Sequence, residues 1–498
     1  MLLGTFELLL GICGLLLIIY SYWSLKFNFW KSRNVPGPKP IFFFGTTKDV
    51  ILRKVSLGHY VSRLYKKYSN EPMFGIYLRN RPILIINDPE LIKNVLIKDF
   101  KHFMERGLTS NDKIEPLSAH LFLLEAKRWR PMRTKLTPVF TSGKLKEMFH
   151  LIAEVAERFD KYLNKFDGKT VDMRDISAKF TTDTIGVCAF GLEAHALDDE
   201  DSIFRKMGKR VFTTSWRSYV QFTLMGSMPI LYNLVGRLFI DHVLEKFFIN
   251  LTKETIEYRK ENNIKRHDFI DLLTNMKDKN DKIDDIELTD SLLAAQLFVF
   301  FVAGFETSSS TMSNCLFELA MNPEIQKKIK LEITEELKKS DGKFTYEMIQ
   351  NMKYLDKVFK ETLRKYPPVM FLSRKTIDPY TIPDTNITLP IGTAVWTPVY
   401  GIHHDPKYYP EPEVFDPERF TDEEVEKRPA MSYLPFGDGP RNCIGLRFGQ
   451  LQTKVGLVKI LQNHTVNVCE ETDKTYNADL RNNILAPKNG IKLQINKQ

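Results

Sequence analysis

One cysteine lies in a sequence context that could present it to a metal. Cys443 ends the glycine-rich stretch FGDGPRNC and is followed by Ile444 and Gly445. The glycines allow a tight turn and a close approach of the backbone to a flat partner. The pattern predicts a helix over 443–462, and a cysteine at the start of a helix is stabilised as a thiolate. Such a thiolate can ligate iron and favour cleavage of an O–O bond, and Arg441 could neutralise a carboxylate of the same macrocycle.

The other cysteines and the histidines indicate no second metal site. Four further cysteines stand at positions 13, 188, 315 and 469. They form no C-x-x-C pair and no disulfide framework, so we interpret them as reduced, structural residues. His403 and His404 have no partner at ligand spacing and are interpreted as structural. No nucleotide-binding glycine motif is present, so electrons for a redox reaction would come from another protein.

Two polar neighbours in a predicted helix over 289–320 could deliver protons. An acid, Glu306, stands beside a hydroxyl, Thr307, and such a pair can pass protons through water to reduced dioxygen. Helical spacing places Phe300, Ala303 and Thr307 on one face, and the small residues Ala303 and Gly304 would let a flat cofactor lie against it. The alternative is that the Thr307 hydroxyl bonds back to its own helix.

Two pairs with helical spacing carry less information by themselves. Glu361 and Arg364 stand at i,i+3, and Trp129 and Arg133 at i,i+4. Taken alone, each pair is typical of a helix surface.

The pattern F-x-x-G-x-R-x-C-x-G at 436–445 gives these residues a common context. Because of this pattern, the chain resembles a microsomal cytochrome P-450, a haem-thiolate monooxygenase. The resemblance covers essentially all of residues 1–498. Its overall pattern is similar to the insect family-six group. The resemblance implies a mainly α (α+β) cytochrome P-450 fold, with a large helical domain and a smaller β-rich portion. It also implies haem b, O₂ as co-substrate, and electrons from NADPH through a partner flavoprotein reductase, with a cytochrome b-type protein as a further donor.

The resemblance also implies roles for individual residues. Those expected to hold the haem are Cys443 as iron ligand, Phe436, Ala303, Trp129, Arg133, Arg374 and Arg441, with Arg106 a weaker candidate. Glu306 and Thr307 are expected to serve oxygen activation. A buried network of Glu361, Arg364 and Arg419 is expected to hold the cysteine loop. The expected substrate pocket comprises Phe300, Ala303, Val369, Met370, Phe371, Leu372, Ile484, Leu485 and the segment 105–122.

The expected reaction is insertion of one oxygen atom from O₂ into a lipophilic substrate. The family implies xenobiotics such as plant secondary compounds and insecticides, with endogenous lipids or hormones as a further class. A large apolar pocket discriminates weakly between hydrophobic molecules. Two alternatives stay open: a haem-thiolate isomerase or dehydratase that acts on peroxides, and a haem protein that senses a ligand without turnover. The Glu306–Thr307 pair argues against the first.

The N-terminal segment is predicted to be a membrane anchor. Residues 8–25 contain no charge, and with residues 2–6 they are long enough as a helix to cross about 30 Å of hydrocarbon. Aromatic residues and then lysines and arginines follow, which places the rest of the chain on the cytosolic side. A cleaved signal peptide would need a basic start and a small-residue cleavage site, and the sequence has neither. We therefore expect an anchor over 1–25, a basic, proline-rich hinge over 26–40 and a catalytic domain over 41–498, on the endoplasmic reticulum membrane. The sequons at Asn250, Asn386 and Asn463 should then be unglycosylated.

Periodicity predicts one helical body with few strands. A hairpin is expected from 74–78 and 83–86, and short strands within 371–398. Helices are expected over 143–165, 173–190, 233–262, 289–320, 322–338, 351–365 and 443–462. Residues 222–240 are apolar but interrupted, which fits either core packing or shallow insertion into a membrane. The polar run 277–285 is expected to be a loop.

The net charge of +9 does not indicate nucleic acid, because no nucleic-acid reading motif accompanies it. Arg447 and Lys454 share a helical face, whereas Lys459 points away from them. A second basic set comprises Lys127, Arg128, Arg130 and Lys135. Both sets could form a surface for an acidic electron donor; ordinary solvated surface is the alternative.

Overall fold

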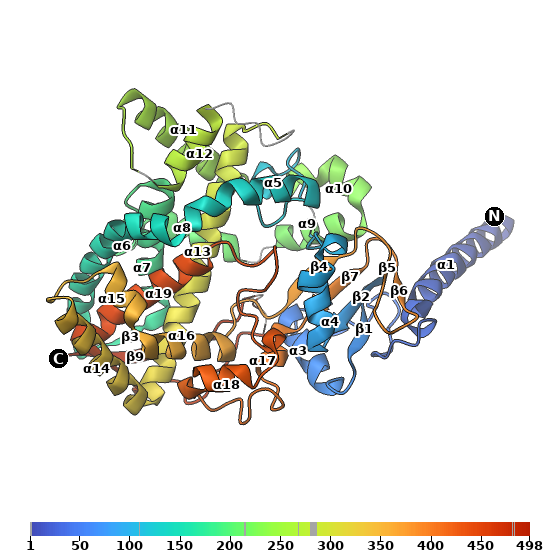
Figure 1. The fold of residues 1–498 in the computed structure, drawn as a ribbon. Helices are drawn as coiled ribbons and strands as arrows, with labels where there is room; N and C mark the ends of the chain where they lie inside the picture. The colour runs from blue at the N-terminus through green and yellow to red at the C-terminus, as the bar shows by residue number, and fades with distance from the viewer. Residues whose placement is uncertain are drawn as a thin grey trace.

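A computed structural model describes residues 2–108, 110–213, 216–266, 268–278, 286–480, 482 and 484–498. The body is mainly helical, with one group of small sheets on the side of α1, another sheet on the opposite side near α14, and one helix projecting from it (Figure 1). The helices are α1 (Leu2–Lys31), α2 (Lys48–Ile51), α3 (Leu57–Lys67), α4 (Pro89–Lys93), α5 (Ala126–Leu136), α6 (Ser142–Leu163), α7 (Met173–Ile185), α8 (Ile203–Phe212), α9 (Trp216–Ser227), α10 (Pro229–Val235), α11 (His242–Glu261), α12 (Phe269–Asp278), α13 (Asp290–Met321), α14 (Pro323–Lys339), α15 (Tyr346–Asn351), α16 (Lys353–Lys365), α17 (Val399–His403), α18 (Asp422–Glu426) and α19 (Leu446–Asn463).

The strands form three small sheets. They are β1 (Met73–Leu78), β2 (Arg81–Ile86), β3 (Thr170–Asp172), β4 (Leu372–Lys375), β5 (Tyr380–Thr381), β6 (Thr388–Leu389), β7 (Ala394–Thr397), β8 (His464–Asn467) and β9 (Lys492–Lys497). The largest sheet has the order β1-β2-β7-β4, in which β2 and β7 run parallel, with Ile83 opposite Ala394. The mainly helical fold class, the hairpin and the short strands within 371–398 are thereby confirmed.

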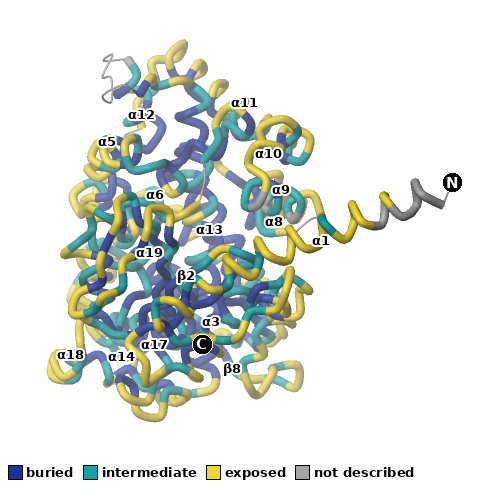
Figure 2. The backbone as a smooth tube through the Cα atoms, turned by 90° about the vertical axis from the view of Figure 1, so that its right-hand side faces the viewer, coloured by how far each residue is buried: buried dark blue, intermediate teal, exposed yellow. Residues whose placement is uncertain are grey.

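The long helix α13 runs through the core. It packs against α7, α11 and α19, and it is apolar on most sides because it is surrounded by other helices. Thr289 caps its first turn by accepting a 3.2 Å hydrogen bond from the N–H of Leu292. In Figure 2, buried residues lie in the middle of the body. Exposed residues lie mainly at its edges and along α1.

Most predicted helices are present within a few residues of their expected bounds, and two expectations are corrected. The helix expected over 233–262 is interrupted, because Asp241 caps a new helix, α11, by accepting hydrogen bonds from the N–H groups of Val243 and Leu244. The last long helix begins at Leu446 rather than at 443, so Cys443 lies in the preceding loop. In the run 277–285, the first two residues belong to α12, and residues 279–285 lie outside the described residues.

Helix α1 stands away from the body (Figures 1 and 2). Among the described residues, two helices are long and apolar enough to cross a membrane, Leu10–Lys31 and α13. Because α13 is mostly buried in the body, α1 is the one available for a membrane. The helix continues past residue 25 to Lys31, and its last turn packs on the body.

Residues 222–240 divide between the two interpretations. They fold mainly into the end of α9 and into α10, which are too short to span a membrane. Leu224 and Tyr232 are buried, as core packing requires, whereas Ile230 and Leu234 on α10 are largely exposed. The exposed face is apolar, which is typical of a surface with a partner.

Candidate functional site

The loop that carries Cys443 is tightly folded. The N–H of Cys443 donates to the carbonyl of Phe436 over 2.9 Å. Gly439 has a φ of 72°, and a Cβ there would lie 1.9 Å from the carbonyl oxygen of Leu96, so no other residue fits without displacing backbone. Arg133 of α5 holds the loop from the other side, donating to the carbonyl and the side-chain oxygen of Asn442 over 2.9 and 2.8 Å.

The Cys443 thiol is surrounded by protein but faces open space. Cys443 as a whole residue is exposed. The protein around its thiol is nevertheless dense enough that burial raises the pKa of the thiol. The Gly445 N–H and the guanidinium groups of Arg106 and Arg133 act in the opposite direction and favour the thiolate. A deeply placed thiol with free surface and positive neighbours is suited to bind a cationic metal.

The middle of α13 also faces open space. Ala303 is exposed, although Phe301 and Phe305 on the same helix are buried. Thr307, one turn further on, is half-buried. An exposed alanine within a mostly buried helix leaves surface on which a flat group could pack.

Arginines without acidic partners gather near the cysteine loop. Arg374 and Arg441 are almost fully buried, and none of Arg106, Arg133, Arg374 and Arg441 forms an ion pair with a described residue. Buried Nε of Arg106, Nε of Arg374 and Nη1 of Arg441 have no hydrogen-bond acceptor. Burial, together with the charge of Arg106, lowers the pKa of Arg374 to about 9 and that of Arg441 to about 8. Such a cluster is unfavourable unless an anion joins it.

This cluster fits the two carboxylates at the edge of a haem. The ring of Trp129 lies beneath Arg441, with 4.1 Å between the guanidinium carbon and the ring centroid. Arg106 donates to the carbonyl of Arg441 over 2.9 Å and so belongs to the cluster. From the sequence, Arg106 is only a weaker candidate for this role. Buried His120 also keeps an unpartnered Nδ1, with its ring 6.2 Å from that of Phe298 on α13; the sequence did not single it out. Arg133 donates one N–H from each terminal nitrogen to Asn442.

Glu306 and Thr307 are neighbours in the chain but have different partners. The Thr307 hydroxyl donates to the carbonyl of Ala303 over 2.6 Å, which is the alternative left open above. The buried carboxylate of Glu306 accepts a hydrogen bond from Arg174 of α7. The structure therefore does not bring the two functional groups together, and it adds Arg174 to the site.

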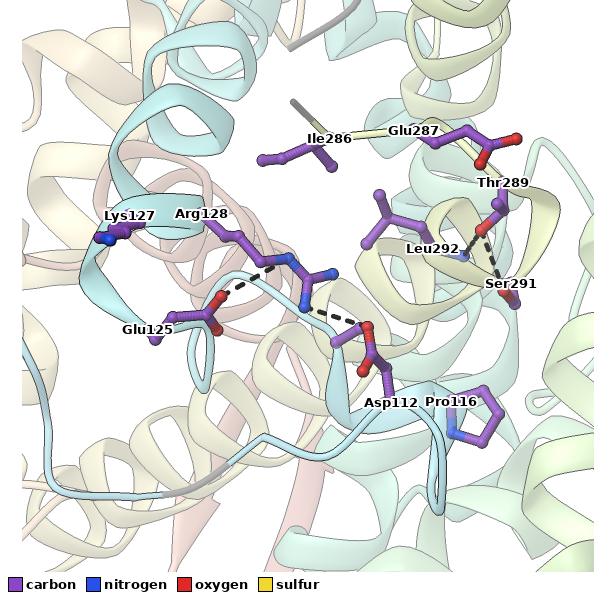
Figure 3. A pocket seen from close by; sticks show the side chains of 11 residues that line it. Asp112, Pro116, Glu125, Lys127, Arg128, Ile286, Glu287, Thr289, Ser291 and Leu292 are labelled. Carbon is purple, nitrogen blue, oxygen red and sulfur yellow. Dashed lines mark hydrogen bonds and ion pairs between the residues drawn. The ribbon is translucent and has the colours of Figure 1, made fainter. Parts of the chain in front are cut away.

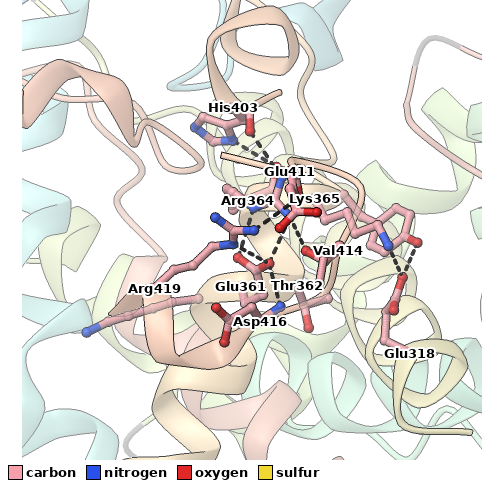
Figure 4. Close-up of polar contacts among 12 residues, drawn as sticks. Glu318, Glu361, Thr362, Arg364, Lys365, His403, Glu411, Val414, Asp416 and Arg419 are labelled. Atoms are coloured by element: carbon pink, nitrogen blue, oxygen red, sulfur yellow. Dashed lines mark hydrogen bonds and ion pairs between the residues drawn. The ribbon is translucent and has the colours of Figure 1, made fainter. Parts of the chain in front are cut away.

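Glu361, Arg364 and Arg419 form a buried network (Figure 4). Arg364 donates from Nε and Nη2 to the two carboxylate oxygens of Glu361, both over 2.8 Å. Arg419 lies 3.6 Å from the same carboxylate. Arg364 also donates to the carbonyl of His403 over 3.1 Å, and Nε2 of His403 accepts from the N–H of Leu434. The network thus reaches the segment that leads into the cysteine loop.

The expected substrate residues separate into two groups. Phe300 is a correction: it packs between Phe140 and Phe269, at ring-centroid distances of 5.3 and 5.2 Å. Met370 and Leu485 are likewise buried together in the core. Phe371 packs on Trp396 at 4.7 Å. Residues that keep free or partly free surface are Ala303, Val369, Leu372 and Ile484, together with Phe298, Val299 and Val302 on α13, which the sequence did not single out.

A separate cavity of about 760 Å³ lies between the segment 112–128 and the start of α13 (Figure 3). Three residues of its lining are joined by ion pairs, because Arg128 contacts Asp112 at 3.0 Å and Glu125 at 3.7 Å. Its lining contains none of the residues around Cys443.

One of the proposed basic surfaces is corrected. Lys454 is buried and paired with Asp356 at 2.6 Å, so it cannot meet a partner. Lys459 is also buried and paired, with Glu157. Exposed cations near the site are Arg447, Lys127, Arg130 and Lys135.

The thiol of Cys443 and the buried arginines could hold the iron and the carboxylates of a haem. Residues 35–495 match the family described as "Cytochrome P450", and the chain belongs to that family. It is 42% identical over 497 residues to "Probable cytochrome P450 6a14" of Drosophila melanogaster, covering 96% of this chain and 97% of the relative. It is 39% identical over 501 residues to "Cytochrome P450 6A1" of Musca domestica, covering 99% and 98%. The expected kinship with the insect family-six group is confirmed, as are the monooxygenase class and the haem-thiolate cofactor.

Proposed function

We propose that the protein is a membrane-anchored monooxygenase that inserts one atom of O₂ into lipophilic compounds, chiefly xenobiotics such as plant secondary compounds or insecticides. Endogenous lipids or hormones are the second substrate class. The observation that carries the proposal is the open face of α13, where Ala303 and the partly exposed Phe298, Val299 and Val302 offer apolar surface. Such a surface binds by burial of apolar area and selects weakly between hydrophobic molecules.

In this proposal the Cys443 thiolate would ligate the iron of the haem. The haem carboxylates would be bound by Arg374, Arg441 and Arg106. Trp129 packs beneath Arg441. Arg133 fixes the cysteine loop, and Phe436 and Ala303 pack on the ring. When bound, the haem supplies O₂ activation and the oxidation of substrate. The protein chain supplies the thiolate, the orientation of the substrate and the traffic of protons.

Glu306 and Thr307 are the proposed proton carriers. The Thr307 hydroxyl is half-buried on the same face of α13 as Ala303, where it could exchange a proton with water beside the haem. Glu306 lies at the boundary between this helix and Arg174, which is partly exposed. In this proposal Glu306 would carry protons inward from solvent when its carboxyl leaves Arg174 and turns toward Thr307.

Family members generally use reductase partners, and we assign this role to an NADPH–cytochrome P-450 reductase, with a cytochrome b-type donor as a second source. The exposed Arg447, Lys127 and Arg130 would meet its acidic surface. The chain divides into an anchor over 1–25, a basic linker over 26–40 and a catalytic body over 41–498. The body faces the cytosol from the endoplasmic reticulum membrane, with the exposed apolar face of α10 resting on the bilayer.

The test is reconstitution of the full chain with reductase, NADPH and heavy-isotope O₂. A lipophilic compound that shifts the haem spin state should yield a product carrying one labelled oxygen atom. Cys443→Ala should lose the red-shifted CO band of the reduced protein together with this product. NADPH consumption without a labelled product from any spin-shifting compound would overturn the proposal, and a retained CO band in Cys443→Ala would overturn the ligand assignment.

A further inference from the structure

The end of the anchor helix is fastened to the catalytic body. Trp30 is only 3% exposed. Its indole Nε1–H donates to the carbonyl of Ile76 on β1 over 3.0 Å, and its backbone N–H donates to the hydroxyl oxygen of Tyr77, also over 3.0 Å. The Tyr77 hydroxyl donates in turn to the carbonyl of Phe27 over 2.8 Å. Helix and strand are thus joined by hydrogen bonds that run in both directions.

A glycine in β1 makes this contact possible. A Cβ on Gly75 would lie 2.4 Å from the Trp30 ring, so any side chain there would expel the indole. The N–H of Gly75 donates to the carbonyl of Pro36 over 2.7 Å, and a Cβ on Gly37 would lie 2.1 Å from the carbonyl oxygen of Gly75. The proline-rich segment after the helix is therefore packed on the same strand. We call Trp30, Gly37, Gly75 and Tyr77 the latch.

A cluster of exposed and half-buried aromatic side chains lies on the helix and against it just before the latch. Trp23 packs against Phe42 and Phe43, at ring-centroid distances of 5.6 and 5.9 Å, and Tyr20 packs against Phe42 at 5.9 Å. Phe43 is 61% exposed and has a φ of 68°. That left-handed conformation is unfavourable for a bulky residue, and here it turns the ring outward rather than into the core. We call Tyr20, Trp23, Phe42 and Phe43 the collar.

We propose that the collar lies in the interfacial layer of the bilayer crossed by α1, and that the latch fixes the angle between the anchor and the catalytic body. The inference rests on the proposed anchor. Aromatic side chains with an apolar body and a polar edge favour that layer. The collar is continuous with the apolar helix, and the exposed cations Lys26, Lys39 and Lys48 nearby suit the headgroup phosphates. The segment 26–40 then acts as a rigid mount that holds the body in one orientation.

The position of the collar is tested with the full-length holoenzyme in bilayers of brominated lipid. Phe43→Trp should add fluorescence that is quenched more by bromine near the headgroup than by bromine at the chain end. Leu331→Trp is the matched control, because Leu331 is an exposed apolar residue on α14, on the opposite side of the body from α1 (Figure 1). Equal quenching of the added fluorescence in the two variants would overturn the assignment of the collar.

The latch is tested by the linear dichroism of the haem in oriented bilayers. The unmodified protein should show a defined dichroism, and Trp30→Ala and Gly75→Ala should lose much of it. Gly143→Ala, where a Cβ meets nothing within 4 Å, should keep it. The CO spectrum of each variant reports whether the body is folded, and Trp30→Ala serves where Gly75→Ala does not fold. Unchanged dichroism in folded Trp30→Ala would overturn the latch, whereas release of the unmodified protein from membranes by alkaline carbonate would overturn the anchor itself.

Discussion

Replacement of Glu361 by alanine should destabilise the protein much more than replacement of an exposed glutamate. Glu361 and Arg364 are both 0% exposed. The carboxylate accepts two hydrogen bonds of 2.8 Å from Arg364 and one of 3.0 Å from the N–H of Asp416. Without it, the Arg364 guanidinium is left with only carbonyl partners, which do not compensate its charge. Loss of one partner from a buried ion pair lowers the free energy of unfolding by about 3–5 kcal/mol.

Glu424 provides the matched control. It pairs with Lys427 at i,i+3 over 2.5 Å, and both side chains are exposed. Such an exposed pair is screened by water and contributes little to stability, so Glu424→Ala should leave stability nearly unchanged. Glu361→Gln keeps the shape of the side chain but removes its charge. Its loss of unfolding free energy should lie between the losses of the two alanine variants.

The measurement is urea-induced unfolding of the full-length variants in one detergent, followed by circular dichroism. Because Arg364 also holds the carbonyl of His403, whose ring accepts from Leu434, Glu361→Ala should retain less haem as well. A shift of the unfolding midpoint no larger than that of Glu424→Ala would refute the reasoning.

The sequence predicts features that depend on neighbours in the chain. The course of α13 and the glycine loop before Cys443 are both local, and each is present. The partners of charged groups are not local. Arg174 lies 132 positions from Glu306, and Asp356 lies 98 positions from Lys454, so helical spacing contains no information about either pair.

Phe300 shows the limit of the helical-face argument. It shares a face with Ala303 and Thr307, yet it packs on Phe140 and Phe269 while Ala303 faces open space. One helical face 32 residues long meets different neighbours along its length. Periodicity identifies the face, but only the tertiary packing decides which part of it meets a ligand.

Three further changes test the remaining parts of the site. Arg441→Ala should lower the ratio of haem to protein, measured by absorbance, because the buried cluster loses a donor to the haem carboxylates; the exposed Arg130→Ala should not. Arg174→Ala should increase NADPH consumed per product formed, because Glu306 loses the partner that holds its carboxyl at the solvent boundary; Arg205→Ala, which breaks the neighbouring pair with Asp175, should leave that ratio unchanged. His403→Gln should change the response to acid. Burial lowers the pKa of His403 well below its ordinary 6.5, so on lowering the pH the unfolded chain takes up a proton that the folded protein does not. Stability is therefore full above pH 6.5, and it falls below that by up to about 1.4 kcal/mol per pH unit from this residue. Urea unfolding between pH 6.5 and 5.5 should show a shallower loss in His403→Gln, and an unchanged slope would mean that His403 is protonated in the folded protein.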